Sequence, residues 1–286
     1  MKLIKQSFKF INQTDFSLVG IKKHIERCAR VSYKSEDKIT GTSYEKFINM
    51  LESRGHDRPL EFGTVHLEID MCPRDIIIDT LTNRGMLNQL WWKETYKNGK
   101  VYVTTNYRYY LAIKKVYPDI DKYFTEEDNK YYSKRYTVHM ILDRGVMDEF
   151  RTHVGLSHLA ESTRYCNYSK DKFGNELTFI DPCWEIRTAN ERITPEGTHV
   201  SSDALEFLTA LNEAEDHYLS LLAKGWTPQQ ARSVLPLGIK SELISCGFED
   251  AWENFMRRRD APDAHPMAQE IAKPMHEEFL KLTRAS

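Results

Sequence analysis

The chain has 286 residues, of which 41% are hydrophobic, and its 40 Lys and Arg side chains against 42 Asp and Glu give a formal net charge of -2. This composition suffices for a sizeable core, and the balanced charge excludes a broad basic surface for nucleic acid or anionic membranes. The sequence holds no apolar run long enough to cross a membrane and opens with no signal-peptide pattern, so we expect a cytoplasmic protein.

The cysteine pattern and the lack of linkers set the expected organisation. The five cysteines have neither a Cys-x-x-Cys motif nor zinc-type spacing, which predicts reduced and mostly structural thiols. No internal repeat, low-complexity tract or glycine-rich linker divides the chain. We therefore expect one compact α/β domain of mixed α+β character over residues 1–286, with a mixed sheet and flanking helices.

In the first half of the chain, helical and strand patterns are mixed. The spacing of apolar residues predicts a helix over Leu18 to Cys28 and a second helix around Ser43 to Ser53. Val65, Leu67 and Ile69 then alternate with other residues, which is typical of a half-buried strand.

Residues 73–134 differ in character from what precedes them. Aromatic and β-branched residues flank Asn98-Gly99, a dipeptide that favours a tight turn, so we predict a β-hairpin. A polar, acidic stretch follows, which is typical of a surface helix or loop. Because the run from Tyr136 to Leu142 resumes a strand pattern comparable to the one that ends at Ile69, we interpret residues 73–134 as an insertion.

The second half of the chain has mainly helical patterns. Leucines at helical spacing between Asp203 and Gly225 predict a long helix. The run Thr227-Pro228-Gln229-Gln230 combines a cap residue, a proline at the first helical position and a glutamine three residues on, so we expect a new helix that carries Arg232. Further helices are expected from Asp250 and from about Asp263, the latter with a proline kink.

Arg259 is expected to point inward. On a helical wheel of about 100° per residue, Trp252, Phe255 and Met256 define an apolar side and Arg259 falls near its centre. The two preceding arginines lie on the outer side. A buried guanidinium is costly unless it meets a carboxylate, a phosphate or a polarised carbonyl, so a structural salt bridge and a ligand-binding role are both open.

The stretch FRTHVGLSHLAESTRYCNYSK, residues 150–170, keeps neither the helical nor the strand period for long and is rich in polar side chains, which indicates a site. Ser162 lacks the GxSxG or SxxK context of a serine hydrolase, and His153 and His158 lack metal-site spacing. The sequence also lacks a glycine-rich phosphate loop, which argues against a nicotinamide or ATP site of the usual kind.

The same stretch resembles the signature of the flavin-dependent thymidylate synthases, or thymidylate synthase complementing proteins: Arg-His-Arg, seven residues, then Ser-x-Arg-Tyr. His153 aligns with the signature histidine, Ser157 with its internal serine, and residues 162–165 with its end. The chain is similar to a branch of the family with a long insertion before the signature. Further blocks follow the family order: CARVSY (28–33), RGHDRPLEFGTVHL (54–67), ARSVLP (231–236), and NFMRRR with AHPMAQEIA (254–272).

This resemblance implies a mixed α/β fold, an FAD-containing homotetramer with sites between subunits, and reductive methylation of dUMP to dTMP. In that reaction 5,10-methylenetetrahydrofolate donates the carbon and NADPH is the reductant. Uracil C5 is a poor nucleophile, so it is activated either by a cysteine that adds at C6 or by polarisation of the ring. None of the five cysteines has a basic setting in the sequence, which favours polarisation.

The resemblance also implies roles for single residues. Arg259 would stabilise the negative charge that develops on the pyrimidine, and Arg232, from a neighbouring subunit, would contact the nucleotide. Ser162 and Arg164 would hold the phosphate through hydrogen bonds. The other positions are expected near the nucleotide (Glu161 and Glu149) or near the flavin (His153, His56, Ser32, Glu61, Asn254 and Arg151).

Several positions depart from the family pattern. Thr152 and Val154 stand where the signature has arginines, and Arg151 is displaced by one position. Glu149 stands where the family has a nucleotide-contacting glutamine, and Phe62 replaces a histidine. Each charge-assisted bond that is lost weakens cofactor binding by about 1–3 kcal/mol.

These departures keep two alternatives open. The first is a homologue that modifies another pyrimidine nucleotide, by hydroxymethylation of dUMP or by acting on dCMP or UMP. The second is a catalytically silent homologue that acts as a binding subunit.

Overall fold

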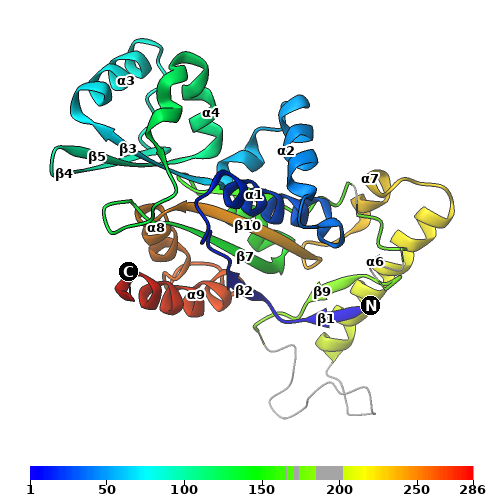
Figure 1. The fold of residues 1–286 in the computed structure, drawn as a ribbon. Helices are drawn as coiled ribbons and strands as arrows, with labels where there is room; N and C mark the ends of the chain where they lie inside the picture. The colour runs from blue at the N-terminus through cyan, green and yellow to red at the C-terminus, as the bar shows by residue number, and fades with distance from the viewer. Residues whose placement is uncertain (165, 171–173, 185–201, 286) are drawn as a thin grey trace.

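The computed structural model describes residues 1–164, 166–170, 174–184 and 202–285. Their strands form three sheets (Figure 1). The central sheet has the order β2-β7-β10-β8 and is antiparallel throughout. Its strands are β2 (Ser7–Phe10), β7 (Arg135–Asp143), β10 (Lys240–Phe248) and β8 (Ser157–Ala160).

The second sheet, in the order β4-β5-β3-β6, is also antiparallel. The parallel pairing of this mixed α/β fold lies in a two-stranded sheet, where β1 pairs with β9. The strands of these two sheets are β4 (Trp92–Lys97), β5 (Lys100–Asn106), β3 (Thr64–Asp70), β6 (Phe124–Thr125), β1 (Lys2–Ile4) and β9 (Thr178–Ile180).

Helices cover both faces of the central sheet (Figure 1). On one face, Ile244 of β10 belongs to the same apolar cluster as Ile25 of α1. On the other face, Leu243 of β10 and Met140 of β7 pack with Trp252 of α8. This division follows from the strand geometry, in which successive side chains point to opposite faces. The covering helices are α1 (Leu18–Tyr33) and α2 (Ser43–Ser53) on the first side, and α5 (Arg144–Phe150), α8 (Glu249–Arg259) and α9 (Pro266–Ala285) on the second.

Most elements predicted in the first half are confirmed. Helix α1 begins after Ser17, whose side chain accepts a hydrogen bond from the Gly20 amide, and it runs past Cys28 to Tyr33. Helix α2 has the predicted bounds, and β3 contains the predicted alternating residues. Short 3-10 helices follow α1 and α2: η1 (Glu36–Lys38) and η2 (Arg58–Phe62).

The segment interpreted as an insertion contains the predicted hairpin. Strands β4 and β5 meet at Asn98 and Gly99, whose φ angles of 52° and 78° give the left-handed turn that this dipeptide favours. The acidic stretch after the hairpin forms a short 3-10 helix and β6. Two α-helices of this segment were not predicted: α3 (Met71–Asn83) and α4 (Tyr107–Val116). In α4, burial of aromatic residues decides the conformation more than intrinsic propensity does. The 3-10 helix is η3 (Pro118–Tyr123).

The main correction to the sequence analysis is β10. We expected the second half to be mainly helical, yet residues Lys240–Phe248 form the strand between β7 and β8. All of its residues after the first are buried. Because side chains on both faces of the strand lie in the core, the sequence shows neither the helical period of 3.6 nor the strand alternation clearly.

The predicted helices of the second half are present. Helix α6 (Ser202–Ala223) matches the leucine pattern. Thr227 and Gln230 form the predicted capping box at α7 (Pro228–Ala231), but α7 is short and passes into η5 (Arg232–Val234) because Leu235 precedes a proline. Helix α8 begins one residue before the predicted Asp250, and α9 continues through the proline where a kink was expected.

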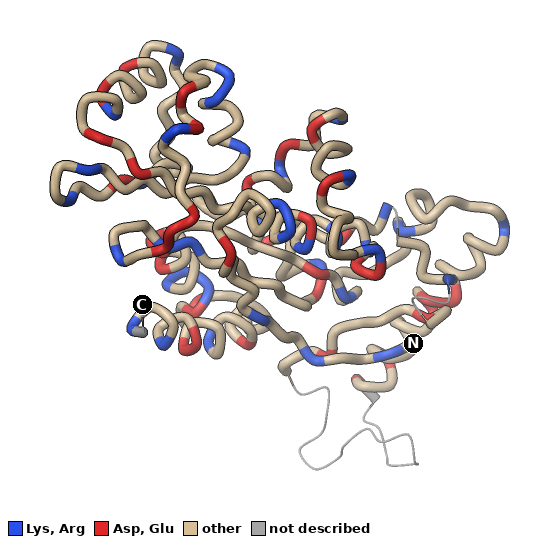
Figure 2. The backbone as a smooth tube through the Cα atoms, viewed as in Figure 1, with Lys and Arg blue, Asp and Glu red and all other residues tan. Residues whose placement is uncertain are grey.

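The distribution of charged residues and the polarity of the helices agree with the amino-acid composition. Figure 2 shows Lys and Arg interspersed with Asp and Glu along the backbone, in line with the formal net charge of -2. Within the described part of the chain, no helix has the length and apolar character that crossing a membrane requires.

Candidate functional site

Strand β8 explains why the 150–170 segment mixes polar and apolar residues without a lasting period. The strand has only 4 residues, and its side chains alternate between the two faces of the sheet. Ser157 donates a hydrogen bond to Glu61 of η2 (Oγ to Oε2, 2.5 Å), on the side of α1. His158 points the other way and contacts the carbonyl oxygen of His153 at 3.3 Å from Nε2. The expected site residues are therefore distributed to both sides of one edge strand.

Arg259 lies in the last turn of α8 and turns inward, as the helical wheel predicts. Its side chain is 19% exposed, whereas the two preceding arginines are exposed. Nη2 donates to the Glu149 carbonyl oxygen at 2.7 Å and to Thr152 Oγ1 at 3.4 Å, and Nη1 lies 3.4 Å from Glu149 Oε2. The guanidinium is 5.7 Å from the centre of the Phe150 ring. Arg259 thus has a carboxylate partner on α5, the salt bridge that was one of the two alternatives.

Two buried nitrogen atoms of this region have no hydrogen-bond partner among the described residues: Nε of Arg259 and Nε2 of His153. Burial lowers the pKa of His153; a backbone hydrogen bond with Ala251 acts against this change, and the charge of Arg259 adds to it. In the neutral ring, Nε2 of His153 donates or accepts according to the tautomer. A ring that carries both a carbonyl oxygen and an N–H, as a flavin or a pyrimidine does, would pair with these buried nitrogen atoms.

The residues next to His153 in the sequence place no cation beside the unpaired nitrogen atoms of His153 and Arg259. Val154 is 77% exposed, and the Thr152 hydroxyl donates to the Glu149 carbonyl oxygen at 2.7 Å. Arg151, expected near the flavin, is exposed and pairs with Asp148 of its own helix at 3.3 Å. The flavin fit therefore rests on hydrogen-bonding groups rather than on the charges of the family signature.

The three residues expected to hold the nucleotide lie in two segments that meet. Arg232 Nη1 donates to Thr163 Oγ1 at 3.3 Å, and Arg164 Nε donates to Gln229 Oε1 at 3.0 Å. Ser162 Oγ accepts from the Arg164 amide at 3.4 Å. Both arginines are exposed. Arg232 makes this contact within its own chain, and the last residue of the signature match, residue 165, lies outside the described residues.

Glu161 belongs to a buried network that we call the ion quartet: Glu161, Lys240, Glu242 and Lys34. Glu161 is 1% exposed and lies 2.9 Å from Lys240 Nζ, while Glu242 contacts both Lys34 and Lys240. Burial alone would raise the pKa of Glu242, but a hydrogen bond from His139 and the two lysines hold it well below its usual range. Burial would likewise lower the pKa of Lys240, and the two carboxylates outweigh it and raise it. Lys240 and Glu242 are therefore charged, and Glu161 is occupied in the fold rather than open to a nucleotide.

Glu61 is similarly engaged. Its carboxylate accepts hydrogen bonds from Ser157 on one oxygen and from Arg108 of α4 on the other, both at 2.5 Å. Its backbone oxygen accepts from Arg135 at 2.7 Å. Glu61 therefore ties the signature strand to the segment interpreted as an insertion, a role that the sequence did not predict.

The remaining flavin-side candidates are not brought together. Ser32 donates to the Ala29 carbonyl oxygen at 2.7 Å within α1, and exposed His56 is 3.3 Å from the Tyr33 hydroxyl. Asn254 accepts from both outer arginines of α8, at 2.7 and 3.3 Å. No hydrogen bond or ion pair among the described residues joins them to His153.

The cysteines lack the features of a nucleophile. Cys28, Cys166 and Cys246 are buried, as expected of structural thiols, while Cys72 and Cys183 are exposed. Burial raises the pKa of Cys166 to about 12, helped by Glu161, and raises that of Cys28 as well. A protonated buried thiol adds poorly to a pyrimidine ring, so activation by polarisation is favoured.

Several site residues were missed in the sequence. Lys240 and Glu242 share one face of β10, which a strand assignment of the apolar run would have revealed through the spacing of two. Gln229, the partner of Arg164, lay within the recognised capping motif. Arg108 and Lys34 carried no sequence signal, because their partners are distant in the chain.

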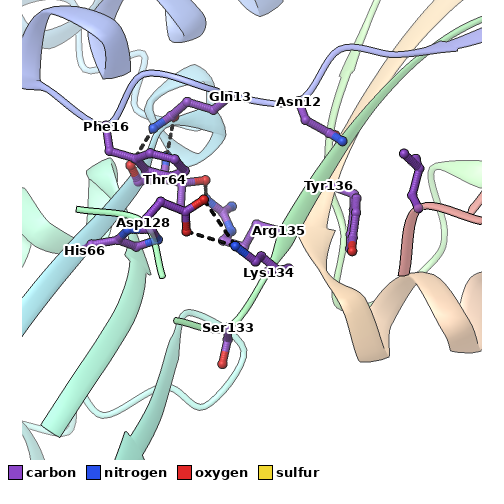
Figure 3. A pocket seen from close by; sticks show the side chains of 11 residues that line it. Asn12, Gln13, Phe16, Thr64, His66, Asp128, Ser133, Lys134, Arg135 and Tyr136 are labelled. Atoms are coloured by element: carbon purple, nitrogen blue, oxygen red, sulfur yellow. Dashed lines mark hydrogen bonds and ion pairs between the residues drawn. The ribbon is translucent and has the colours of Figure 1, made fainter. Parts of the chain in front are cut away.

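A small pocket of about 180 Å³ lies between the N-terminal segment and the start of β7 (Figure 3). Its polar groups largely satisfy one another: Gln13 forms two hydrogen bonds with the Thr64 backbone, at 2.9 and 2.8 Å, and Lys134 pairs with Asp128 at 2.9 Å. His66 stacks between two aromatic rings, and burial lowers its pKa to about 4. These internal pairs leave few groups for a ligand, so the candidate site is the region around β8.

Comparisons with known proteins bear on the family of the chain. A sequence model described as thymidylate synthase complementing protein matches residues 133–283, which begin where the interpreted insertion ends and include the ion quartet apart from Lys34. No curated protein matches the chain. A solved structure described as a UMP/dUMP methylase, PolB from Streptomyces cacaoi, bound with 5-Br UMP is similar at 16% identity and a TM-score of 0.44, over 99% of this chain and 92% of that chain. Because the family match covers more than half of the sequence and contains the signature, the chain belongs to the thymidylate synthase complementing protein family.

Proposed function

We propose that the protein is a flavin-dependent thymidylate synthase that converts dUMP to dTMP by reductive methylation, with 5,10-methylenetetrahydrofolate as carbon donor and NADPH as reductant through FAD. The observation that carries this proposal is the meeting of Ser162, Arg164 and Arg232 from two distant segments. Two exposed guanidinium groups beside a hydroxyl form a suitable receptor for a phosphate dianion, which prefers charge-assisted and bidentate hydrogen bonds.

Arg259 is proposed as the catalytic residue. Before C5 of the pyrimidine attacks the one-carbon unit, polarisation of the ring draws negative charge onto a ring oxygen, and a guanidinium aimed at that oxygen stabilises this polarised form. Arg259 is partly buried and retains an unpaired Nε–H, so it offers a donor to the base even while Nη2 is bonded to Glu149. The buried thiols of Cys28 and Cys166, whose pKa values are raised, are not set up to add at C6, which supports this route.

His153 is proposed to face the flavin. A bound flavin supplies the electrons that reduce the transferred carbon to a methyl group. The His153 ring is neutral because burial lowers its pKa, and its unpaired Nε2 is the atom offered to the cofactor. The homotetramer and a cytoplasmic location remain part of the proposal, and exposed apolar side chains near the nucleotide segment, such as Trp226 and Leu237, are suitable for a subunit interface.

The first experiment records the visible absorption spectrum of the purified protein before and after addition of FAD and dUMP, followed by NADPH without oxygen. We expect a flavin spectrum that bleaches with NADPH and responds to dUMP, and dTMP detectable by mass spectrometry once the folate is added. Failure to bind flavin under all these conditions would leave the catalytically silent subunit as the better account.

A matched pair of variants tests the nucleotide site. Arg232→Ala is expected to weaken dUMP binding by roughly 10- to 100-fold, the range for loss of a hydrogen bond between charged groups. Arg257→Ala, an exposed arginine on α8, is the control and should leave the affinity unchanged. Isothermal titration calorimetry measures both, and an equal effect of the two variants would remove Arg232 from the site.

A second candidate function is modification of another pyrimidine nucleotide, and Glu149 favours it. Its carboxylate lies 3.4 Å from Arg259 where the family has a glutamine, and an ionised carboxylate accepts hydrogen bonds but donates none. A base that presents an amino group, as cytosine does, would therefore suit this position better than a carbonyl. Competition of dCMP and UMP against dUMP for binding separates the two candidates.

A further inference from the structure

A cavity of about 550 Å³ lies between α4, η2 and the residues just before β4, and nothing in the proposed function uses it. Its volume is within the range of small-molecule sites. On the α4 side the wall includes Arg108, Leu111, Ala112 and Lys115, beside Tyr109 and Lys114. The spacing of the first four, i, i+3, i+4 and i+7, places them on one face of the helix. The cavity is thus built mainly by the segment that we interpret as an insertion.

This face of α4 combines an apolar middle with a cation at each end. At 1.5 Å rise per residue, the Cα atoms of Arg108 and Lys115 are about 10 Å apart. Leu111 and Ala112 lie between them, and Leu60 of η2 adds apolar surface across the cavity. A ligand that matches the wall has an apolar body and at least one anionic group.

Trp91 provides an aromatic wall that is already held in place. Its backbone oxygen accepts a hydrogen bond from Thr105 Oγ1 at 2.6 Å, and its ring centre lies 5.8 Å from that of Tyr109. The Arg108 guanidinium lies 5.5 Å from the indole centre. Aromatic rings stack both on indole and on guanidinium planes, so this corner of the cavity suits a ring.

The charges that face the cavity orient such a ligand. Lys115 is exposed and forms no ion pair or hydrogen bond with any described residue, while Lys114 already pairs with a carboxylate. On the opposite side stand Glu52 and Asp57, the latter 4.0 Å from Arg108 Nη2. An anionic group is therefore attracted to the α4 wall and repelled from the other side.

Arg108 also connects the cavity with the signature strand. Its Nη1 donates to Glu61, whose other carboxylate oxygen accepts from Ser157. The guanidinium has five N–H donors, and within the described residues only this one forms a hydrogen bond. An anion in the cavity would accept hydrogen bonds from the unpaired N–H groups of Arg108 and compete with Glu61 for the guanidinium.

We propose that this cavity binds an aromatic molecule that carries a carboxylate or a phosphate. The ring lies against Trp91, and the anionic group lies on the α4 wall with Arg108 and Lys115. Binding draws Arg108 away from Glu61 and thereby changes the hydrogen bond that Ser157 of β8 donates to the same carboxylate. The inference does not depend on the proposed function, because binding is measured without turnover.

The test is isothermal titration calorimetry of the full chain, saturated with dUMP, with indole-3-carboxylate and AMP. They carry a ring with a carboxylate and a ring with a phosphate, and neither takes part in the proposed reaction. We expect at least one of them to bind, and the one that binds identifies the anion. Adenosine, which has the ring of AMP without the phosphate, is expected to bind at least roughly tenfold more weakly than AMP if AMP binds. Binding of neither anion, or adenosine binding as tightly as AMP, would overturn the proposal.

Variants locate the binding. Lys115→Ala is expected to weaken it about fivefold and Trp91→Leu about tenfold, whereas Glu61→Gln frees Arg108 and should strengthen it about fivefold. Lys122→Ala on η3 removes the same charge from an exposed position outside the cavity and serves as the control. Equal effects of Lys115→Ala and Lys122→Ala would contradict the location. Saturating FAD should leave the affinity unchanged, and competition by FAD would contradict a site separate from the flavin.

Discussion

Two charged clusters flank strand β8, and they differ in how completely their polar atoms are paired. In the ion quartet, each carboxylate contacts at least one lysine and Glu242 also accepts from His139. In the Arg259 cluster, by contrast, Nε of Arg259 and Nε2 of His153 are buried without a partner among the described residues. A network whose polar atoms are all paired makes the fold rigid, whereas an unpaired buried polar atom has a free-energy cost that a bound ligand can remove. The comparison indicates a folding role for the quartet and supports the proposed catalytic role of Arg259.

The largest expected effect comes from breaking the quartet. Lys240→Met leaves Glu161 and Glu242 with one cation fewer in a buried place, and removal of one partner of a buried pair lowers the free energy of unfolding by about 3–5 kcal/mol. Lys100→Met removes one partner of an exposed pair with Glu68 and should change it by about 1 kcal/mol or less. Urea unfolding followed by circular dichroism measures both, and equal losses would contradict the contrast between them.

Arg259→Ala should lower turnover strongly and the free energy of unfolding only slightly. We expect turnover to fall by about 100- to 1000-fold, as for loss of one group that stabilises developing charge, while the free energy of unfolding changes by about 1 kcal/mol. Arg258→Ala, the exposed neighbour, is the control for both quantities. Turnover that survives in Arg259→Ala would remove this residue from the mechanism, and dUMP binding measured in parallel separates loss of the nucleotide from loss of chemistry.

His158 lies on β8 between the two clusters and gives the stability a pH dependence. Burial lowers its pKa from 6.5 to about 4, so the unfolded chain takes up the proton first as the pH falls. Its contribution is therefore intact above pH 6.5 and is lost as the pH decreases toward 4. His158→Gln should remove about 3 kcal/mol of this dependence, measured as urea unfolding across that range. The same slope in His158→Gln and in the control His217→Gln, at an exposed position of α6, would refute the assignment.

The smallest effect is expected from Glu149→Gln, which restores the residue typical of the family. The carboxylate is 41% exposed and 3.4 Å from Arg259, so the pair contributes at most about 1 kcal/mol. Without it, Arg259 is freer to meet an anionic nucleotide, and KM for dUMP should fall by up to about fivefold with unchanged stability. Glu253→Gln on α8 is the matched control. A rise of KM for dUMP would mean that Glu149 itself contacts the substrate.

Local signals in the sequence were sufficient where short-range chemistry decides the structure. The turn at Asn98 and Gly99 follows from the left-handed conformations that these residues tolerate, and the capping box of Thr227 and Gln230 follows from hydrogen bonds within one turn. The inward direction of Arg259 follows from helical period alone. Ordered motif blocks likewise identified the family, which the sequence match confirms.

Other features depend on contacts between residues far apart in the chain. Strand β10 was missed because both of its faces are buried, which removes the alternation that marks a strand. Glu161 was expected to contact the nucleotide, yet its partners Lys34 and Lys240 come from the end of α1 and the start of β10. Arg108 meets Glu61 only because α4 packs against η2.

The sequence by itself determined the family, most helices and the hairpin, and it supplied candidate site residues, because these depend on spacing along the chain. The tertiary structure decided which of those residues are free. Glu161 and Glu61 are engaged by cations from distant elements, whereas His153 and Arg259 keep an unpaired nitrogen atom each within the described part of the chain. The physical reason is that pairing of a buried charge depends on where the sheet and helices bring its partner, and that information is not local.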